Sequence, residues 1–159
     1  MARAIYLTHP QVDIGPARPV HDWQLSDVGR RRAERLASAA PLSAVSRIVS
    51  SAERKALETA APIAEARGIA VEVRPAMHEN DRRSTGFLPP ARFEQVADQF
   101  FARPEESVLG WERAVDAQDR ILGEVMACLA GGLRGDILFV GHGAVGRRCR
   151  QIVFVRTLF

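Results

Sequence analysis

The chain has 159 residues, of which 47% are hydrophobic and 26% are charged, the composition of an ordinary globular protein. This length is sufficient for a single domain with a full hydrophobic core. Collagen-like, coiled-coil and wholly disordered chains are excluded. No apolar run approaches the roughly 20 residues of a membrane span, so we expect no membrane partner. Of the 22 basic residues, 21 are Arg and the remaining one, Lys55, is Lys.

The formal net charge of +3 arises at the end of the chain. Four arginines and no acidic residue follow Gly146. The rest of the chain has 18 of the 22 basic residues and all 19 acidic ones, so its charges nearly balance. A nucleic-acid-binding protein usually carries its basic surface across the fold, so this layout predicts no nucleic-acid partner. Cys128 and Cys149 have neither zinc-site nor CxxC spacing, and we therefore expect a reducing, cytoplasmic location.

Short apolar runs alternate with segments of helical periodicity along the chain. In chain order, the pattern predicts a strand at 4–7, a helix at 28–40 after the N-cap Ser26, a strand at 47–50, a helix between the N-cap Ser51 and the stop residue Gly68, a strand at 69–73, an irregular loop at 75–90, helices at 91–101 and 110–129, and a strand at 136–140. Strands separated by helices at this spacing predict an α/β fold with a mainly parallel sheet.

Polar residues follow the carboxyl end of each expected strand. His9 follows the first strand, Ser51 and Lys55 follow the second at the start of a helix, Glu79 follows the third, and His142 follows the fourth. In parallel α/β sheets, ligands bind outside the carboxyl ends of the strands. We therefore expect these side chains to converge on one rim of the sheet.

Two histidines, a cation at a helix start and a carboxylate suit phosphoryl transfer. A neutral imidazole can attack phosphorus and hold the phosphoryl group covalently. A lysine and the free N–H groups of a helix N-terminus stabilise the negative charge on the phosphoryl oxygens. A carboxylic acid with a raised pKa can protonate the departing oxygen.

Four motifs occur in a recognisable order. They are Thr8-His9-Pro10 after the first strand, Ser50-Ser51 followed by Arg54-Lys55-Ala56 and Thr59-Ala60, Glu79 after the third strand, and Gly141-His142-Gly143 after the fourth. With the helical segment 25–33, they resemble the histidine phosphatase superfamily, also called phosphoglycerate mutase-like. The resemblance covers residues 2 to 146.

The resemblance implies a three-layer α/β/α domain over residues 1–146 and a phosphatase mechanism. A phosphomonoester or a phosphorylated side chain would be hydrolysed through a phosphohistidine, with a small phosphorylated substrate or a phosphoprotein as partner. The implied roles are catalytic for His9, His142 and Glu79 and phosphate-binding for Lys55, Thr8 and Ser51, with no metal and no organic cofactor.

The departures from the family pattern weaken its anion clamp. Thr8 replaces an arginine, Pro10 replaces a glycine and so lacks a backbone donor, and Lys55 replaces a second arginine with a point charge. Arg82 or Arg83, in the loop, is a candidate for compensation. These departures favour an alternative function, a catalytically impaired relative that binds a phosphorylated ligand or a protein partner.

Each candidate residue also has a structural interpretation. His9 can cap a loop at a strand end, and Lys55 can be a solvated residue on a helix. Asp81 competes with Glu79 for the role of the acid, as do Glu105, Glu106 and Glu112. Two histidines and a carboxylate are also a catalytic zinc set, but no His-x-x-x-His spacing supports zinc here.

Residues 147–159 form an atypical basic tail of the same domain. Arg147, Arg148 and Arg150 interrupt the apolar pattern where the family has a buried helix, so we expect a shortened or altered C-terminal part. Residues 151–159 still contain an apolar run typical of a strand. A bare sheet edge would favour self-association, so a homo-oligomer is one expectation.

Overall fold

The computed structural model of the protein describes residues 2–132, 134–146 and 154–155. The strands are β1 (Ala4–Thr8), β2 (Val45–Ser51), β3 (Val71–Arg74), β4 (Asp136–Gly141) and β5 (Phe154–Val155). The α-helices are α1 (Asp27–Ala37), α2 (Arg54–Arg67), α3 (Pro90–Ala102), α4 (Ala114–Leu129) and α5 (Gly143–Gly146). Short 3₁₀ turns are η1 (Val20–Asp22), η2 (Ala40–Leu42), η3 (Pro75–Met77) and η4 (Val108–Gly110).

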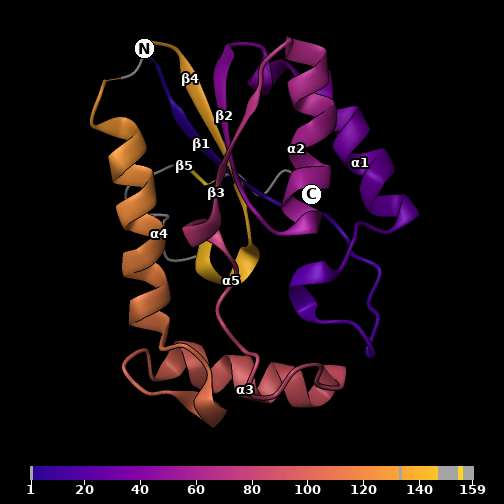
Figure 1. The fold of residues 1–159 in the computed structure, drawn as a ribbon, viewed down its shortest axis with the longest axis vertical. Coiled ribbons are helices and arrows are strands. Elements are labelled where there is room, and N and C mark those ends of the chain that lie inside the picture. The colour runs from indigo at the N-terminus through magenta and orange to yellow at the C-terminus, as the bar shows by residue number, and fades with distance from the viewer. Residues whose placement is uncertain (1, 133, 147–153, 156–159) are drawn as a thin grey trace.

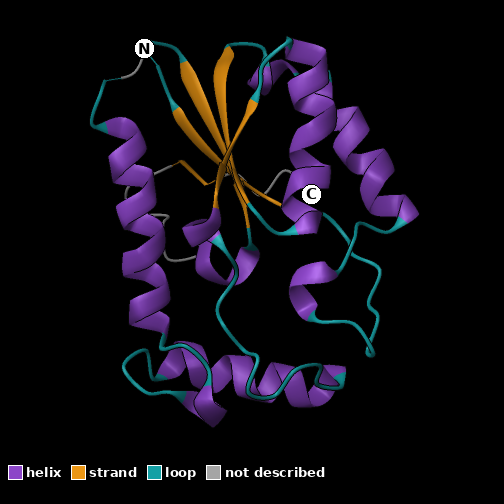
Figure 2. Ribbon diagram, in the orientation of Figure 1, coloured by secondary structure: helices purple, strands orange, loops and turns teal. Residues whose placement is uncertain are grey.

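The strands form one sheet in the order β3-β2-β4-β1-β5, and every pairing in it is parallel. Helices α1 and α2 lie on one side of the sheet and α4 lies on the other (Figure 1). Figure 2 shows the strands of the sheet between the helices that flank it. The predicted α/β fold with a parallel sheet is confirmed, and its layers are helix, sheet and helix.

Successive side chains of each strand enter opposite cores because strand side chains alternate between the two faces of a sheet. Leu7 packs with Ile63 of α2 on one face, and its neighbour Tyr6 packs with Ile121 of α4 on the other. All six residues of β4 are buried. A central strand covered on both faces explains why residues 137–140 form a continuous apolar run.

Helix α3 lies beyond the carboxyl ends of the strands, across the end of the molecule (Figure 1). It has a small core of its own, in which Val96 and Phe100 pack with Val108, Trp111 and Ala114. The segment between β3 and α4 is therefore packed around its own small core. It lies opposite the carboxyl ends of the strands, where the candidate site residues are expected.

Two predicted helix starts are wrong by a few residues. The N-cap of α2 is Glu53 rather than Ser51, whose hydroxyl accepts a hydrogen bond from the Glu53 N–H at 3.2 Å. Helix α4 begins at Ala114 rather than at 110, because Leu109 and Gly110 have positive φ values of 52° and 78° and turn the chain there.

The expected strand in the tail is present at Phe154–Val155, which pairs with β1 beside Ile5 and Tyr6. The other expectations for the tail, including its altered C-terminal part, fall mainly on 147–153 and 156–159, outside the described residues. Within the described parts of the chain, we find no helix that is both long and apolar enough to cross a bilayer.

Candidate active site

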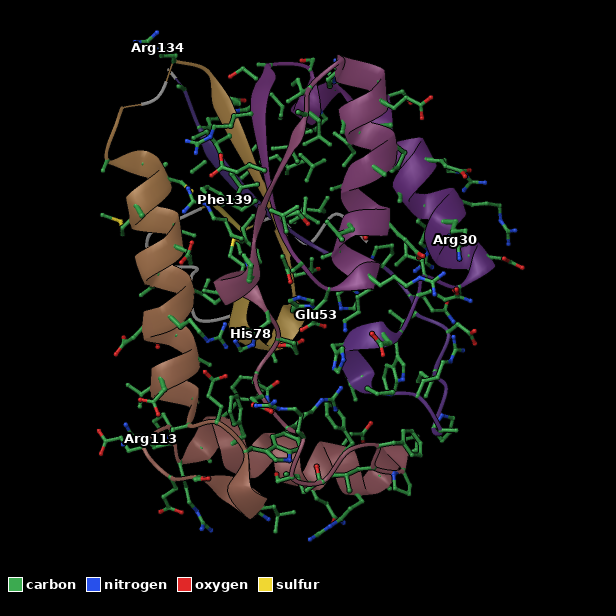
Figure 3. The ribbon with its side chains drawn as sticks, viewed as in Figure 1. Arg30, Glu53, His78, Arg113, Arg134 and Phe139 are labelled. Carbon is green, nitrogen blue, oxygen red and sulfur yellow. The ribbon has the colours of Figure 1, made fainter. Side chains whose placement is uncertain are left out.

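The predicted rim is formed where β1, β2 and β4 end. Figure 3 shows Glu53 and His78 at this end of the sheet, while Arg134 marks the opposite end. The ligating atoms of His9, Glu79 and His142 all lie within 4.8 Å of one another. Residues that are far apart in the sequence therefore meet at one point, as the strand-end rule predicts.

His9 is held by two backbone contacts. Its N–H donates to the Gly141 carbonyl of β4 at 3.1 Å, and its ring Nδ1 lies 2.9 Å from the Pro10 carbonyl. A carbonyl can only accept, so Nδ1 carries the proton and Nε2 is left with a free lone pair. Burial lowers the pKa of His9, which keeps the ring neutral.

His142 is completely buried, and its ring lies against that of His9 with a centroid distance of 5.4 Å. Its Nε2 lies 2.9 Å from the Ser51 hydroxyl. That hydroxyl accepts from the Glu53 N–H, and among the described residues Nε2 is the only acceptor within hydrogen-bond distance of its own proton, so the imidazole proton lies on Nδ1. Among the described residues, the buried Nδ1 has no hydrogen-bond partner. It is a donor available to a ligand.

The pKa of His142 lies well below its ordinary value. Burial is the main cause, and the neighbouring His9 and the charged Lys55 lower the pKa further. The imidazole is therefore neutral, and Nδ1 can donate its single proton without the ring carrying a charge.

Gly141 and Tyr6 fix the position of His142. The His142 N–H donates to the Tyr6 hydroxyl at 3.3 Å. A Cβ at Gly141 would lie 2.1 Å from that hydroxyl oxygen, a separation that atoms cannot adopt. Glycine is therefore required at this strand end, because the tyrosine occupies the space that a side chain would need.

Lys55 is buried in the first turn of α2, with 2% of the residue exposed. Its ammonium donates to the Val20 carbonyl at 2.9 Å and forms a short ion pair with Glu53. The interpretation of Lys55 as a solvated residue is therefore wrong. An ammonium has three donors, so one proton remains for a ligand after these two contacts.

Glu53 occupies the centre of the site, although the sequence analysis did not select it. One carboxylate oxygen pairs with Lys55; the other accepts the Glu79 N–H at 2.8 Å and lies 3.7 Å from His142 Nε2. Its charge offsets that of Lys55, so the cation is weaker toward an anion than its position suggests. The sequence signal for a role of Glu53 is its position two residues before Lys55, the lysine expected at the phosphate.

Glu79 lies near the two histidines and is partly buried. One carboxyl oxygen accepts its neighbour's N–H, that of Asn80, at 3.1 Å. Burial raises the pKa of Glu79, and the nearby Glu53 charge raises it further. A carboxyl with a raised pKa keeps its proton at a higher pH, which is the requirement for a general acid.

The other candidate residues are placed as follows. Thr8 is the last residue of β1, opposite Gly141 and partly buried. The Ser51 hydroxyl contacts His142 and the Glu53 N–H. Asp81 is ion-paired with Arg83, so its carboxylate already has a cationic partner.

The set of His9, Glu79 and His142 is also one that could hold zinc, since two histidines and a carboxylate are ligands that zinc accepts. His9 Nε2 has a free lone pair, whereas His142 Nδ1 carries the proton and could ligate a metal only after that proton moved to Nε2. The three side chains are close enough together for a metal, and the expectation of a metal-free site stays a prediction.

The chain matches the family described as histidine phosphatase superfamily (branch 1) over residues 9–153. It therefore belongs to this superfamily, and the resemblance noted from its motifs is confirmed. No curated protein matches the chain.

Several solved structures share the fold. The native structure of mycobacterial glucosyl-3-phosphoglycerate phosphatase superposes with a TM-score of 0.78 at 24% identity, covering 91% of this chain and 76% of that one. Its complex with inorganic phosphate gives a TM-score of 0.74 at 25% identity, covering 91% and 75%. A phosphoserine phosphatase from Entamoeba histolytica, in complex with 3-phosphoglyceric acid, gives 0.74 at 17% identity, covering 94% and 78%. The fold is thus phosphoglycerate mutase-like, and family and neighbours support a phosphatase-type function in general.

Proposed function

We propose that the protein is a phosphatase that hydrolyses a phosphomonoester or a phosphorylated side chain through a phosphohistidine on His9. The observation that carries the proposal is the hydrogen bond from His9 Nδ1 to the Pro10 carbonyl. It leaves Nε2 as a neutral nucleophile within reach of a second neutral histidine and of a carboxyl whose pKa is raised by burial.

In the first step, the lone pair of His9 Nε2 attacks phosphorus and the bond from phosphorus to the leaving oxygen breaks. Glu79 gives its proton to that oxygen, so the leaving group departs as a neutral alcohol. The raised pKa of Glu79 supports this role, because the carboxyl must be protonated when the bond breaks.

The charge that develops on the phosphoryl oxygens meets two donors. His142 contributes the proton on its unpartnered Nδ1, and Lys55 contributes its remaining ammonium proton. Thr8 lies at the same strand end, and we assign its hydroxyl to the phosphate as well. Ser51 acts at the phosphate through His142, whose Nδ1 tautomer its hydroxyl maintains.

In the second step, water attacks the phosphohistidine. Glu79, now a carboxylate, takes a proton from that water, the bond from phosphorus to Nε2 breaks, and inorganic phosphate leaves. His9 and Glu79 return to their starting protonation states. No metal or organic cofactor enters the balance of either step.

The test is to trap the intermediate. The protein is mixed with p-nitrophenyl phosphate, quenched in alkaline denaturant to preserve an acid-labile phosphate, and mapped by mass spectrometry. Among the four histidines, we expect the adduct on His9 alone, and His9→Ala should abolish both the adduct and phosphate release. An adduct on another histidine, or phosphate release that persists in His9→Ala, would contradict the proposal.

The Glu53–Lys55 ion pair favours a second candidate, a catalytically impaired protein that binds a phosphorylated ligand or protein partner. The pair offsets the positive charge of the site, and Thr8 replaces the family's arginine. Saturable binding of a phosphorylated compound with neither adduct nor phosphate release would support this candidate over the phosphatase.

A further inference from the structure

Arg82 carries a charge that its surroundings do not neutralise by contact. Within the described residues, its guanidinium makes no hydrogen bond and no ion pair, and its Nε is buried without a partner. Arginine stays protonated in proteins, so a full positive charge is held in a partly buried position. Unpaired buried charges are costly and are therefore rare unless they serve a ligand.

Three aromatic rings hold this guanidinium in place. Its central carbon lies 4.7 Å from the centroid of Phe93, 5.9 Å from that of Trp23 and 6.0 Å from that of Trp111. Ring faces attract a cation, but they accept none of its five N–H donors in the way an oxygen does. The cage therefore positions the arginine and leaves its hydrogen-bonding capacity free.

The rings themselves are fixed. Trp23 and Trp111 are 6% and 2% exposed. The Trp23 indole donates to the Gly15 carbonyl at 3.1 Å, and the Trp111 indole donates to the Thr85 hydroxyl at 2.8 Å. The three rings come from the loop before α1, from α3 and from the segment before α4, so distant parts of the chain combine to hold one side chain. Such preorganisation is typical of a binding residue.

Arg82 faces a cavity of about 620 Å³ that Glu53 and Glu79 also line. In the proposed reaction, the Glu79 carboxyl must lie at the leaving oxygen. The space between Glu79 and Arg82 therefore receives what lies beyond that oxygen, which is the leaving group. A guanidinium with free donors in this space matches an oxyanion, which it can bind with two parallel hydrogen bonds.

We propose that Arg82 binds a second anionic group, a carboxylate or a phosphate, carried by the leaving group of the substrate. This inference rests on the proposed function for the direction in which the substrate lies. It narrows the substrate to a phosphomonoester of an acidic alcohol and makes Arg82 a specificity-determining residue. The non-acidic counterpart of such a substrate would leave the guanidinium without an oxygen partner.

The first test measures binding without catalysis. Phosphonates are suitable because their P–C bond is not hydrolysed by the proposed reaction. Calorimetry compares propylphosphonate with 3-phosphonopropionate, which adds a carboxylate, and with 1,3-propanebisphosphonate, which adds a second phosphonate. We expect at least one acidic probe to bind about 10- to 100-fold more tightly than propylphosphonate, the effect of one hydrogen-bonded charge pair. The acidic probe that gains more identifies the preferred group.

Variants assign that preference to Arg82. Arg82→Gln should erase the preference and leave propylphosphonate binding within about threefold, while Arg82→Lys should keep only part of it because a point charge cannot form the paired bonds. Arg92→Gln, an exposed arginine of α3, should behave as wild type. A preference that survives Arg82→Gln, or equal binding of all probes by the wild type, would overturn the inference. Equal weakening of all probes would place Arg82 at the shared phosphonate and also overturn it.

A purely structural arginine would give a different result. If Arg82→Gln lowered the melting temperature by several degrees without changing the order of affinities, the guanidinium would be a packing element and the inference would be wrong. The proposed function fails separately: an Arg82-dependent preference for acidic phosphonates, with no phosphohistidine on His9, would retain the binding site and reject the hydrolysis.

Discussion

Lys55 pairs with Glu53 in a nearly dry environment, with side-chain exposures of 3% and 9%. The pair compensates each charge only while both partners are present, because removing one leaves the other buried and unpaired. A phosphate ion that entered the site would be an alternative partner for the ammonium. The stability of the protein and its affinity for phosphate are therefore coupled through this one contact.

Glu53→Gln should reveal that coupling. We expect the variant to be destabilised by about 3 kcal/mol in the absence of ligand, while the amide oxygen still accepts the Glu79 N–H. Inorganic phosphate should then raise the melting temperature of the variant more than that of the wild type, because the freed ammonium binds it more tightly. Thermal unfolding with and without phosphate measures both effects.

Glu106→Gln is the matched control, since Glu106 forms an exposed pair with Arg103 in which the side chains are 60% and 58% exposed. It should change neither the stability nor the phosphate response appreciably. If Glu53→Gln gained no extra stabilisation from phosphate, Lys55 would not be a phosphate ligand.

The pKa values of His9 and Glu79 predict the pH profile. A lowered pKa moves the acid limb of kcat/KM, where His9 becomes protonated and loses its nucleophilic lone pair, to lower pH. A raised pKa moves the alkaline limb, where Glu79 loses the proton that the leaving group needs, to higher pH. Both shifts widen the interval in which a neutral histidine and a protonated carboxyl coexist.

The check is the profile of Glu79→Gln. With an alkyl phosphate, we expect kcat/KM to fall by about 10²- to 10⁴-fold, the usual contribution of a general acid. With p-nitrophenyl phosphate the loss should be smaller, because nitrophenolate leaves without a proton, and the alkaline limb should disappear while the acid limb remains. Persistence of the alkaline limb in this variant would show that another group is the acid.

At the scale of elements, the sequence was sufficient to predict the alternation of strands and helices. The buried run at β4 and the helical spacing of α2 are local properties, and the strand-end rule then brings His9 and His142 together. The start of α2 could not be predicted, because the Ser51 hydroxyl could either cap the helix or form a hydrogen bond with another part of the chain. It serves His142 rather than capping the helix, and that choice depends on a residue 91 positions away.

Gly141 tests how tightly the end of β4 is packed. Gly141→Ala would place a Cβ 2.1 Å from the Tyr6 hydroxyl oxygen, so the tyrosine, and with it the His142 N–H, must move. We expect a destabilisation of about 1–3 kcal/mol, typical of an overpacked core, and a loss of activity larger than that of any surface variant. Urea unfolding and phosphate release measure the two effects.

Gly123→Ala is the control within the same molecule. Gly123 lies in α4, and no atom comes within 4 Å of a Cβ built there. Alanine is favoured over glycine inside a helix by about 0.5–1 kcal/mol, so this variant should be more stable than the wild type and equally active. Equal stability changes in the two variants would mean that the contact at Gly141 can relax.

At the scale of the whole molecule, two parts of the chain position different groups of the site. The sheet positions the histidines through short strands with dry cores on both faces. The segment with α3 and η4 has its own aromatic core and supplies two of the rings that position Arg82, which lines the cavity. The sequence predicted the first part through periodicity. It could not predict the second, because the ring cage joins Trp23, Phe93 and Trp111 without any repeating spacing.

The N-terminal strand is tied to the centre of the sheet by a cluster of charge-assisted hydrogen bonds. The Arg3 backbone N–H donates to Asp136 at 2.8 Å, its guanidinium donates to the same carboxylate at 2.9 and 2.5 Å, and a further donor reaches the Pro41 carbonyl at 3.1 Å. The bonds from Arg3 hold the pKa of Asp136 below its usual range. The Asp136 side chain is 4% exposed, so its charge depends on the contacts with Arg3 rather than on water.

Acid should therefore loosen the join between β1 and β4. A carboxyl whose pKa is lower in the folded state stabilises the protein fully above its unfolded pKa, and the stabilisation is lost as pH falls toward the folded pKa. We expect Asp136→Asn to be less stable than wild type at pH 7, with a difference that shrinks as urea unfolding is repeated at progressively lower pH. Asp119→Asn, which removes an exposed carboxylate of α4 that has no ion pair among the described residues, should show a small difference at every pH. A difference for Asp136→Asn that stayed constant down to pH 2 would mean that its charge is not what joins the two strands, and the amide would then be failing through its shape alone.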